Sequence, residues 1–217
     1  MTKATEKTCW IYGEGDFDPA CPHVPEPGDL VIAADSGLAL ISRLGLKADL
    51  VVGDFDSLGR TPAGENVVTL PVEKDVTDAA AAVALGRKRG YRRFSFVGCS
   101  GGRPDHTFAA YQTLADLASR GEIGLLFENG FTVTAIRDGS LAFPPRESGT
   151  FAAFAVGGDA RGVTISGVYY PLSDATLTPT FPLGVSNSFV GKPVAVTVGD
   201  GTLLVFAEGY PIPAFGE

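Results

Sequence analysis

The sequence predicts an α/β region followed by an all-β region, and three observations carry that prediction. Short β-rich runs alternate with helical segments through about residue 128, the usual pattern of a parallel sheet covered on both faces. Beyond about Asn129, strand-like runs are separated by Gly and Pro turns, without a convincing helix. Several N-terminal runs end in loops containing Gly and Asp. Because ligands of parallel sheets bind beyond the carboxyl ends of the strands, we expect a ligand site there.

The elements of the first region follow from local signals. In the helix expected at 77–89, Thr77 is the predicted N-cap, an alanine run supplies helix propensity, and Arg87, Lys88 and Arg89 complement the C-terminal dipole. Gly45, Gly90 and Gly121 are predicted helix stops. The expected strands are 9–12, 30–34, 50–52 and 94–97, and the other expected helices are 37–44 and 105–120. In the second region the clearest strands are 132–136, 150–155, 194–198 and 202–206.

Composition and charge narrow the classes of function. Hydrophobic residues make up 45% of the 217 residues and charged residues 19%, which is ordinary for a folded globular protein. The formal net charge of −8 disfavours a nucleic-acid partner, whose binding needs clustered Lys and Arg. An acidic protein that binds a polyanion such as ATP requires a divalent cation or a local basic cluster.

The cysteines and the N-terminus indicate a cytoplasmic protein. Cys9, Cys21 and Cys99 are odd in number and lack CxxC spacing, so neither a disulfide framework nor a zinc site is expected. No stretch approaches the roughly 20 apolar residues of a membrane span, and no apolar run follows the first charged residues. We therefore expect no membrane partner.

Two acidic motifs are candidates for metal and phosphate chemistry. Asp54 and Asp56 stand two apart after an apolar strand, so an extended backbone directs both carboxylates to one side, where they can hold magnesium. Aspartates in turns that bond to their own backbone are the alternative. In Lys74-Asp75-Val76-Thr77-Asp78, both carboxylates can face one ligand and Lys74 can reach a phosphate, whereas a capped helix with an acidic first turn explains the same pattern.

Two further candidates follow strands. Gly98 to His106 leads into a helix, where Arg103 can neutralise phosphate charge and Asp105 and His106 can contact a nucleotide. The segment has neither Walker A nor GxGxxG spacing, and a plain strand-to-helix turn accounts for its glycines. Asp35 can approach the metal site or cap the next helix, the commoner role. The nearby loop 13–15 (Gly-Glu-Gly) is a further candidate, with an ordinary turn favoured.

Taken in order, the motifs resemble thiamine pyrophosphokinases over most of the chain. They are Asp35-Ser36-Gly37, Gly53-Asp54-Phe55-Asp56-Ser57, Lys74-Asp75-Val76-Thr77-Asp78, Gly101-Gly102-Arg103-Pro104-Asp105-His106 and Ser186-Asn187. The resemblance implies a Rossmann-like, parallel-sheet α/β nucleotide-binding catalytic domain at 1–128 and an all-β sandwich at 129–217. The second domain would bind thiamine and form a homodimer, with active sites at the subunit junction.

The resemblance also implies roles for individual residues. Asp54, Asp56, Asp75 and Asp78 would be catalytic, with Mg²⁺ held by Asp54, Asp56 and Asp78. ATP would be bound by Asp35, Lys74, Arg103, Asp105 and His106. Thiamine would be bound by Ser186 and Asn187, for which a hydrogen-bonded turn is the structural alternative. The expected reaction is transfer of diphosphate from ATP to the hydroxyl of thiamine, giving thiamine diphosphate and AMP.

Some features leave other functions open. The family often has Glu where this chain has Ser188, and often an Asn near Ala110. These departures favour, as one alternative, a non-catalytic nucleotide or thiamine sensor, although all the acidic motifs are retained. Asp-x-Asp alone also fits a metal-dependent nucleotide-sugar transferase. Tyr169, Tyr170 and Phe189 can stack on an aromatic ligand, with core or interface packing the commoner role.

Overall fold

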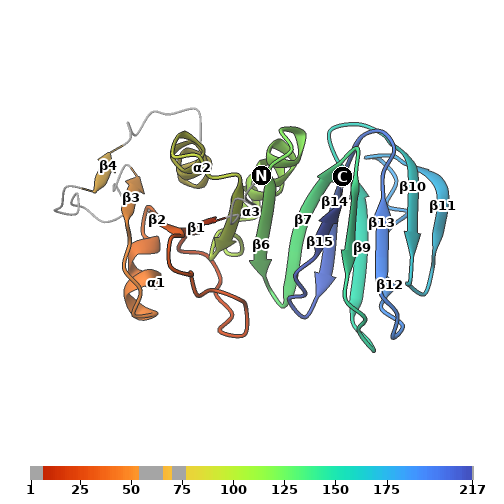
Figure 1. Ribbon diagram of the computed structural model, residues 1–217, viewed down its shortest axis with the longest axis horizontal. Helices are drawn as coiled ribbons and strands as arrows, with labels where there is room; N and C mark the ends of the chain where they lie inside the picture. The colour runs from red at the N-terminus through yellow and green to blue at the C-terminus, as the bar shows by residue number, and fades with distance from the viewer. Residues whose placement is uncertain (1–6, 54–65, 70–76, 217) are drawn as a thin grey trace, which may run out of the picture. The chain divides into compact units, whose positions relative to one another are not determined.

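The computed structural model describes residues 7–53, 66–69 and 77–216. The chain divides into two compact units, which interleave in sequence because α3 and β6 each contribute to both. Unit 1 contains residues 1–110 and 126–129, and unit 2 contains residues 111–125 and 130–217. The domain boundary expected after residue 128 therefore stays a prediction. Figure 1 locates the elements.

Unit 1 is built on strands that pair in parallel in the order β5-β1-β2-β3-β4. Cys9 lies opposite Leu30 on one side and Phe94 on the other. The strands are β1 (Thr8–Tyr12), β2 (Leu30–Ala34), β3 (Leu50–Gly53), β4 (Val67–Thr69) and β5 (Arg93–Val97), and the helices that begin in this unit are α1 (Gly37–Arg43), α2 (Asp78–Lys88) and α3 (Pro104–Ser119). Every residue of β2 and β3 is buried, as expected for strands covered on both faces.

The helices begin and end where the local chemistry predicts. The Thr77 Oγ1 accepts a hydrogen bond from the Ala80 backbone N–H at 3.2 Å, which confirms the predicted N-cap of α2. Gly45, Gly90 and Gly121 have φ of 68°, 92° and 67° after the three helices, the left-handed conformation of helix C-termini. Gly86 allows α2 to pack closely on the sheet, since a Cβ there would lie 2.7 Å from the Cys9 Sγ.

Unit 2 contains two antiparallel sheets, and no helix begins after residue 129 within the described residues. One sheet has the order β7-β14-β9-β12 and the other the order β11-β10-β13-β8-β15. β6 (Ile123–Glu128) precedes the strands β7 (Phe131–Arg137), β8 (Ser140–Phe143), β9 (Thr150–Ala155), β10 (Ala160–Ser166), β11 (Leu172–Leu177), β12 (Asn187–Ser188), β13 (Val194–Thr197), β14 (Thr202–Glu208) and β15 (Ala214–Gly216). The expected break from α/β to β-rich character is therefore present.

The two sheets of unit 2 share one hydrophobic core. Phe151 of β9, Phe143 of β8 and Phe189 make edge-to-face contacts with centroid separations of 5.8 to 6.4 Å. Phe189 is 3% exposed, so it packs in the core and does not offer its ring to a ligand. Tyr169 and Tyr170, by contrast, are 65% and 64% exposed.

Candidate functional site

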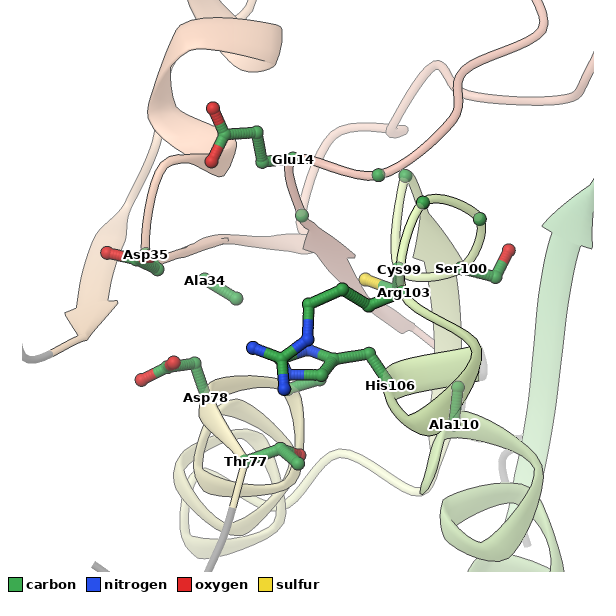
Figure 2. A pocket seen from close by; sticks show the side chains of 16 residues that line it. Glu14, Ala34, Asp35, Thr77, Asp78, Cys99, Ser100, Arg103, His106 and Ala110 are labelled. Carbon is green, nitrogen blue, oxygen red and sulfur yellow. The ribbon is translucent and has the colours of Figure 1, made fainter. Parts of the chain in front are cut away.

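A cavity of about 470 Å³ lies in unit 1 beyond the carboxyl ends of β1, β2 and β5. This is where a parallel sheet binds its ligands, and the volume suits a nucleotide-sized molecule. Figure 2 shows side chains from the loops after these strands and from the first turns of α2 and α3. The lining consists of Gly13, Glu14, Gly15, Ala34, Asp35, Thr77, Asp78, Ala79, Gly98, Cys99, Ser100, Gly101, Gly102, Arg103, His106 and Ala110.

Backbone contacts hold two of the lining loops together. The N–H groups of Gly13, Gly15 and Asp16 donate to the carbonyls of Val97, Gly98 and Ser100 at 2.9, 2.6 and 2.9 Å. A Cβ at Gly13 or Gly15 would collide with the carbonyl oxygen of Gly98 or Ser100 respectively. These two glycines are therefore required by the close approach of the two backbones. The loop 13–15, for which an ordinary turn was favoured from the sequence, is part of the cavity wall.

The loop before α3 depends on glycine for a second reason. Gly101 and Gly102 have φ of 79° and 63°. The Gly101 N–H donates to the Thr107 Oγ1 at 3.0 Å, which ties the loop to the first turn of α3. Pro104 begins the helix, a position that requires no backbone N–H. The cavity therefore lies against the N-terminal end of a 16-residue helix, where backbone dipoles favour an anion.

Besides Glu14 of the loop after β1, two carboxylates line the cavity from different elements. Asp35 follows β2 with a φ of 49°, and its N–H donates to the Val52 carbonyl at 2.6 Å. Ser36 is the N-cap of α1, so Asp35 precedes the cap instead of forming it. Asp78 is the first residue of α2 and lines the same cavity. The structure thus brings these two predicted residues together.

Arg103 and His106 supply the basic side of the cavity, and Figure 2 shows both side chains directed into it. Asp105 is not part of the lining. Its carboxylate pairs with the Arg103 guanidinium at 2.6 and 3.2 Å, and the two side chains are 63% and 71% exposed. The hydrogen bond from Arg103 lowers the pKa of Asp105, and the same bond raises the pKa of Arg103. The arginine therefore stays charged while its fork is held by Asp105.

Cys99 contributes a thiol to the lining without being a nucleophile. Burial raises its pKa to about 12, so the thiol stays protonated at neutral pH. Its Sγ lies 3.6 Å from the carbonyl oxygens of Ile11 and Val97. The cysteine therefore fills space between β1 and β5, and the chemistry of the cavity belongs to its carboxylates and basic side chains.

The remaining predicted site residues lie elsewhere or outside the described residues. Asp54, Asp56, Lys74 and Asp75 belong to the segments that the structure does not describe. Gly53, the last described residue before Asp54, packs against Asp35, since a Cβ at Gly53 would lie 3.0 Å from the Asp35 Cα. Ser186 and Asn187 belong to unit 2. Ser186 is exposed and Asn187 is buried.

Sequence reasoning gave too little weight to part of the lining. Gly13, Glu14 and Gly15 line the cavity. The sequence signal that could have identified this loop is a Gly-x-Gly directly after a strand. Ala110, where the family often has Asn, is buried and also lines the cavity. No group of three or more His, Cys, Asp or Glu with metal-binding geometry occurs in the part of the chain that the structure describes. The described residues of the cavity therefore supply three carboxylates, those of Glu14, Asp35 and Asp78.

Comparison with known proteins identifies the family. The model of the thiamin pyrophosphokinase catalytic domain matches residues 21–123, and that of the thiamin pyrophosphokinase vitamin B1 binding domain matches residues 141–203. No curated protein sequence matches the chain. Its fold is that of an α/β region with a cavity beyond its strand ends, followed by a region of β-sheets. The chain belongs to the thiamin pyrophosphokinase family, whose enzymes use ATP and thiamine, and it is an enzyme of that activity.

Solved structures show the same fold over most of the chain. Thiamine pyrophosphokinase from Bacillus subtilis has 22% identity and a TM-score of 0.83, covering 93% of this chain and 99% of its own. The Geobacillus thermodenitrificans enzyme has 21% identity and a TM-score of 0.78, covering 93% and 97%. Yeast thiamin pyrophosphokinase has 13% identity and a TM-score of 0.68, covering 95% and 88%. A sheet-containing α/β part and a second sheet domain are therefore common to all of them.

Proposed function

We propose that the unit 1 cavity is where this thiamine diphosphokinase binds ATP and transfers its diphosphate. The observation that carries the proposal is the convergence of Asp35, Asp78, Arg103 and His106 on one cavity at the strand ends. Arg103 and the N-terminal end of α3 offset phosphate charge in a chain whose net charge is −8. His106 contacts the nucleotide from the same helix turn, and Asp105 keeps Arg103 in position.

The donor set of the cavity fits magnesium. Mg²⁺ normally takes one or two carboxylates and completes its coordination with substrate phosphates and water. Asp35 and Asp78 line the cavity, and Asp54 follows Gly53, which packs against Asp35. Asp54, Asp56 and Asp78 would hold the ion, with Asp75 nearby in sequence. When bound, it would neutralise charge that develops on the transferring diphosphate.

The transfer itself follows from positioning. The hydroxyl oxygen of thiamine attacks the β-phosphorus of ATP, forming an O–P bond and releasing the hydroxyl proton. The bond between the β-phosphorus and its bridging oxygen to the α-phosphate breaks, and AMP leaves with that electron pair. Arg103 and Lys74 hold the phosphates, so the chain contributes orientation and charge neutralisation without a covalent intermediate. The high pKa of Cys99 is consistent with this route.

Several finer features belong to the same proposal. The parallel pairing of β5-β1-β2-β3-β4 supports a Rossmann-like unit 1, and the shared core of two sheets supports a β-sandwich unit 2. Exposed apolar side chains of unit 2, including Phe181, Leu183 and Val185, support a homodimer that covers them. Three free cysteines support a cytoplasmic location. No described helix is long and apolar enough to cross a membrane.

The decisive experiment follows the products of ATP, Mg²⁺ and thiamine with purified protein. We expect AMP and thiamine diphosphate in equal amounts, with activity lost on chelation of the metal. ADP with thiamine monophosphate would contradict transfer to the β-phosphorus. Binding of both substrates without turnover would favour a sensor, and activity confined to nucleotide sugars would favour the transferase alternative. The family match disfavours both.

A further inference from the structure

Asn187 occupies a buried position in the part of unit 2 that the vitamin B1 binding model matches. It lies on the two-residue strand β12, which pairs with the edge of β9 through Asn187 opposite Phe151. Ser186 and Ser188 on either side are exposed, whereas Asn187 is 7% exposed. Successive side chains of an extended strand point to opposite faces, so Asn187 faces the interior and Ser188 the surface, whereas Ser186 precedes the strand with a φ of 59°.

The side-chain amide of Asn187 is engaged by the backbone of Tyr170 from both ends. Its Oδ1 accepts from the Tyr170 N–H at 2.9 Å, and its Nδ2 donates to the Tyr170 carbonyl at 2.7 Å. The Oδ1 also accepts from the Ser188 N–H at 2.9 Å. Because an amide oxygen has two lone pairs, these bonds use its acceptor capacity and leave one N–H.

These bonds extend a backbone contact that begins one residue earlier. Val168 and Phe189 form an antiparallel bridge, and the Tyr169 N–H donates to the Ser188 carbonyl at 3.0 Å. The Asn187 amide therefore forms the hydrogen bonds that the backbone of a further paired strand residue would form, and it fixes the backbone of Tyr170. A buried amide that pairs with both backbone groups of one residue restricts the backbone on either side of that residue.

The segment that this contact fixes ends in two exposed aromatic rings. Tyr169 and Tyr170 are 65% and 64% exposed, and their rings meet edge to face at 4.7 Å. Exposed aromatic faces held in one orientation attract flat or cationic rings. Thiamine carries both kinds of ring, a neutral pyrimidine and a cationic thiazolium.

We propose that Asn187 is a positioning residue, which fixes the backbone of Tyr170 so that the Tyr170 ring contacts the acceptor, and does not itself bind thiamine. This inference rests on the proposed function, since it concerns the acceptor of the same reaction. It replaces direct contact by Asn187 with an indirect role. Ser186 and Ser188, which are exposed beside it, keep their hydroxyls available on the surface.

The test is a double-mutant cycle with Asn187→Ala, Tyr170→Ala and the double variant, read as the dissociation constant for thiamine by calorimetry. If Asn187 acts through Tyr170, each single variant weakens binding by on the order of tenfold, and the double variant is no weaker than Tyr170→Ala. Direct contact by Asn187 instead predicts that the two fold-changes multiply, which would overturn the proposal.

Kinetics separates positioning from a loss of folding. Asn187→Ala is expected to raise the KM for thiamine on the order of tenfold while the KM for ATP changes less than about twofold. Equal changes in both would overturn the proposal. Thr176→Ala, on an exposed position of β11, is the matched control and should leave both constants unchanged. If Asn187→Ala does not fold, Asn187→Asp keeps the acceptors for Tyr170 and Ser188 and serves in the same cycle.

The binding measurement keeps this inference distinct from the proposed function. Thiamine binding by the wild-type protein without AMP formation would remove the proposed transfer and leave the cycle valid. AMP formation with multiplicative fold-changes would remove only the role assigned to Asn187. Absence of thiamine binding by the wild-type protein would overturn both.

Discussion

The two units differ in where polar side chains lie on their sheets. In unit 1, β2 and β3 are buried along their whole length, so polar chemistry is confined to the loops where the strands end. In unit 2, β13 alternates buried and exposed residues over a core shared by two sheets. Polar groups can therefore stand along its strands. A parallel sheet thus concentrates a site at one edge, whereas antiparallel strands distribute polar groups over their outer faces.

The glycines around the unit 1 cavity also differ from those of one surface turn in unit 2. Gly13, Gly15 and Gly37 of unit 1 lie where a Cβ would collide with a backbone carbonyl, so they allow loops to meet around the cavity. In unit 2, Gly157 and Gly158 lie in a turn where a Cβ would meet nothing within 4 Å. Gly13 and Gly15 are thus constrained by packing, unlike the two turn glycines, and substitutions at Gly13 or Gly15 should affect the site more.

The largest effect is expected from Asp78→Asn, which keeps the shape of the side chain and removes its charge. We expect turnover to fall by about 100-fold, because the site loses a carboxylate that holds the metal and orients the phosphates. Steady-state AMP formation over a range of Mg²⁺ concentrations measures it. Asp116→Asn, an exposed residue of α3, is the control. Full activity of Asp78→Asn with an unchanged Mg²⁺ dependence would remove Asp78 from the site.

Gly15→Ala directly probes the contrast in glycine roles. Its Cβ would collide with the Ser100 carbonyl, so the loop must shift and the wall of the cavity moves with it. We expect on the order of a tenfold rise in the KM for ATP, measured together with the melting temperature. Gly158→Ala in unit 2 should leave the KM for ATP unchanged. Equal behaviour of the two variants would show that the contrast has no functional meaning.

Arg103→Ala should raise the KM for ATP by on the order of tenfold, since it removes a charge-assisted contact to phosphate.

Asp105→Asn should have a smaller effect in the same direction, because it only releases the guanidinium fork. The folded-state pKa of Asp105 is lowered, so its ion pair stabilises the fold above the unfolded pKa. That contribution is lost as pH falls through the folded pKa. The KM for ATP is measured as a function of pH for the wild type and for Asp105→Asn. The same pH dependence in both proteins would exclude a positioning role for Asp105.

The smallest effect is expected at Cys99. Its pKa of about 12 keeps the thiol protonated, so iodoacetamide at pH 7 should modify it slowly and leave activity intact. The thiolate fraction, and with it the alkylation rate, should rise as the pH approaches 12. Mass spectrometry of the Cys99 peptide follows the modification, and Cys99→Ser should retain turnover within about twofold. Rapid inactivation at neutral pH that Cys99→Ser prevents would contradict this prediction.

Much of the fold and part of the site could be predicted because their signals are local. The Thr77 cap and the glycine stops after the helices depend on neighbouring residues, and the structure confirms them. The placement of Asp35, Asp78, Arg103 and His106 on one cavity follows from strand-end positions in a parallel sheet. The role of Gly13 and Gly15 in the cavity wall could not be predicted from the sequence, because the carbonyls that constrain them belong to residues 98 and 100, which are distant in sequence.

By itself, the sequence determined the family and the change from α/β to β-rich character. Those properties depend on motif order and on local periodicity, which a linear chain displays. Only the tertiary structure decided that Phe189 packs in the core and that Asn187 turns inward to Tyr170. The physical reason is that the partner of a side chain depends on which segments, distant in sequence, lie beside it. Each donor or acceptor atom can also form only a limited number of hydrogen bonds.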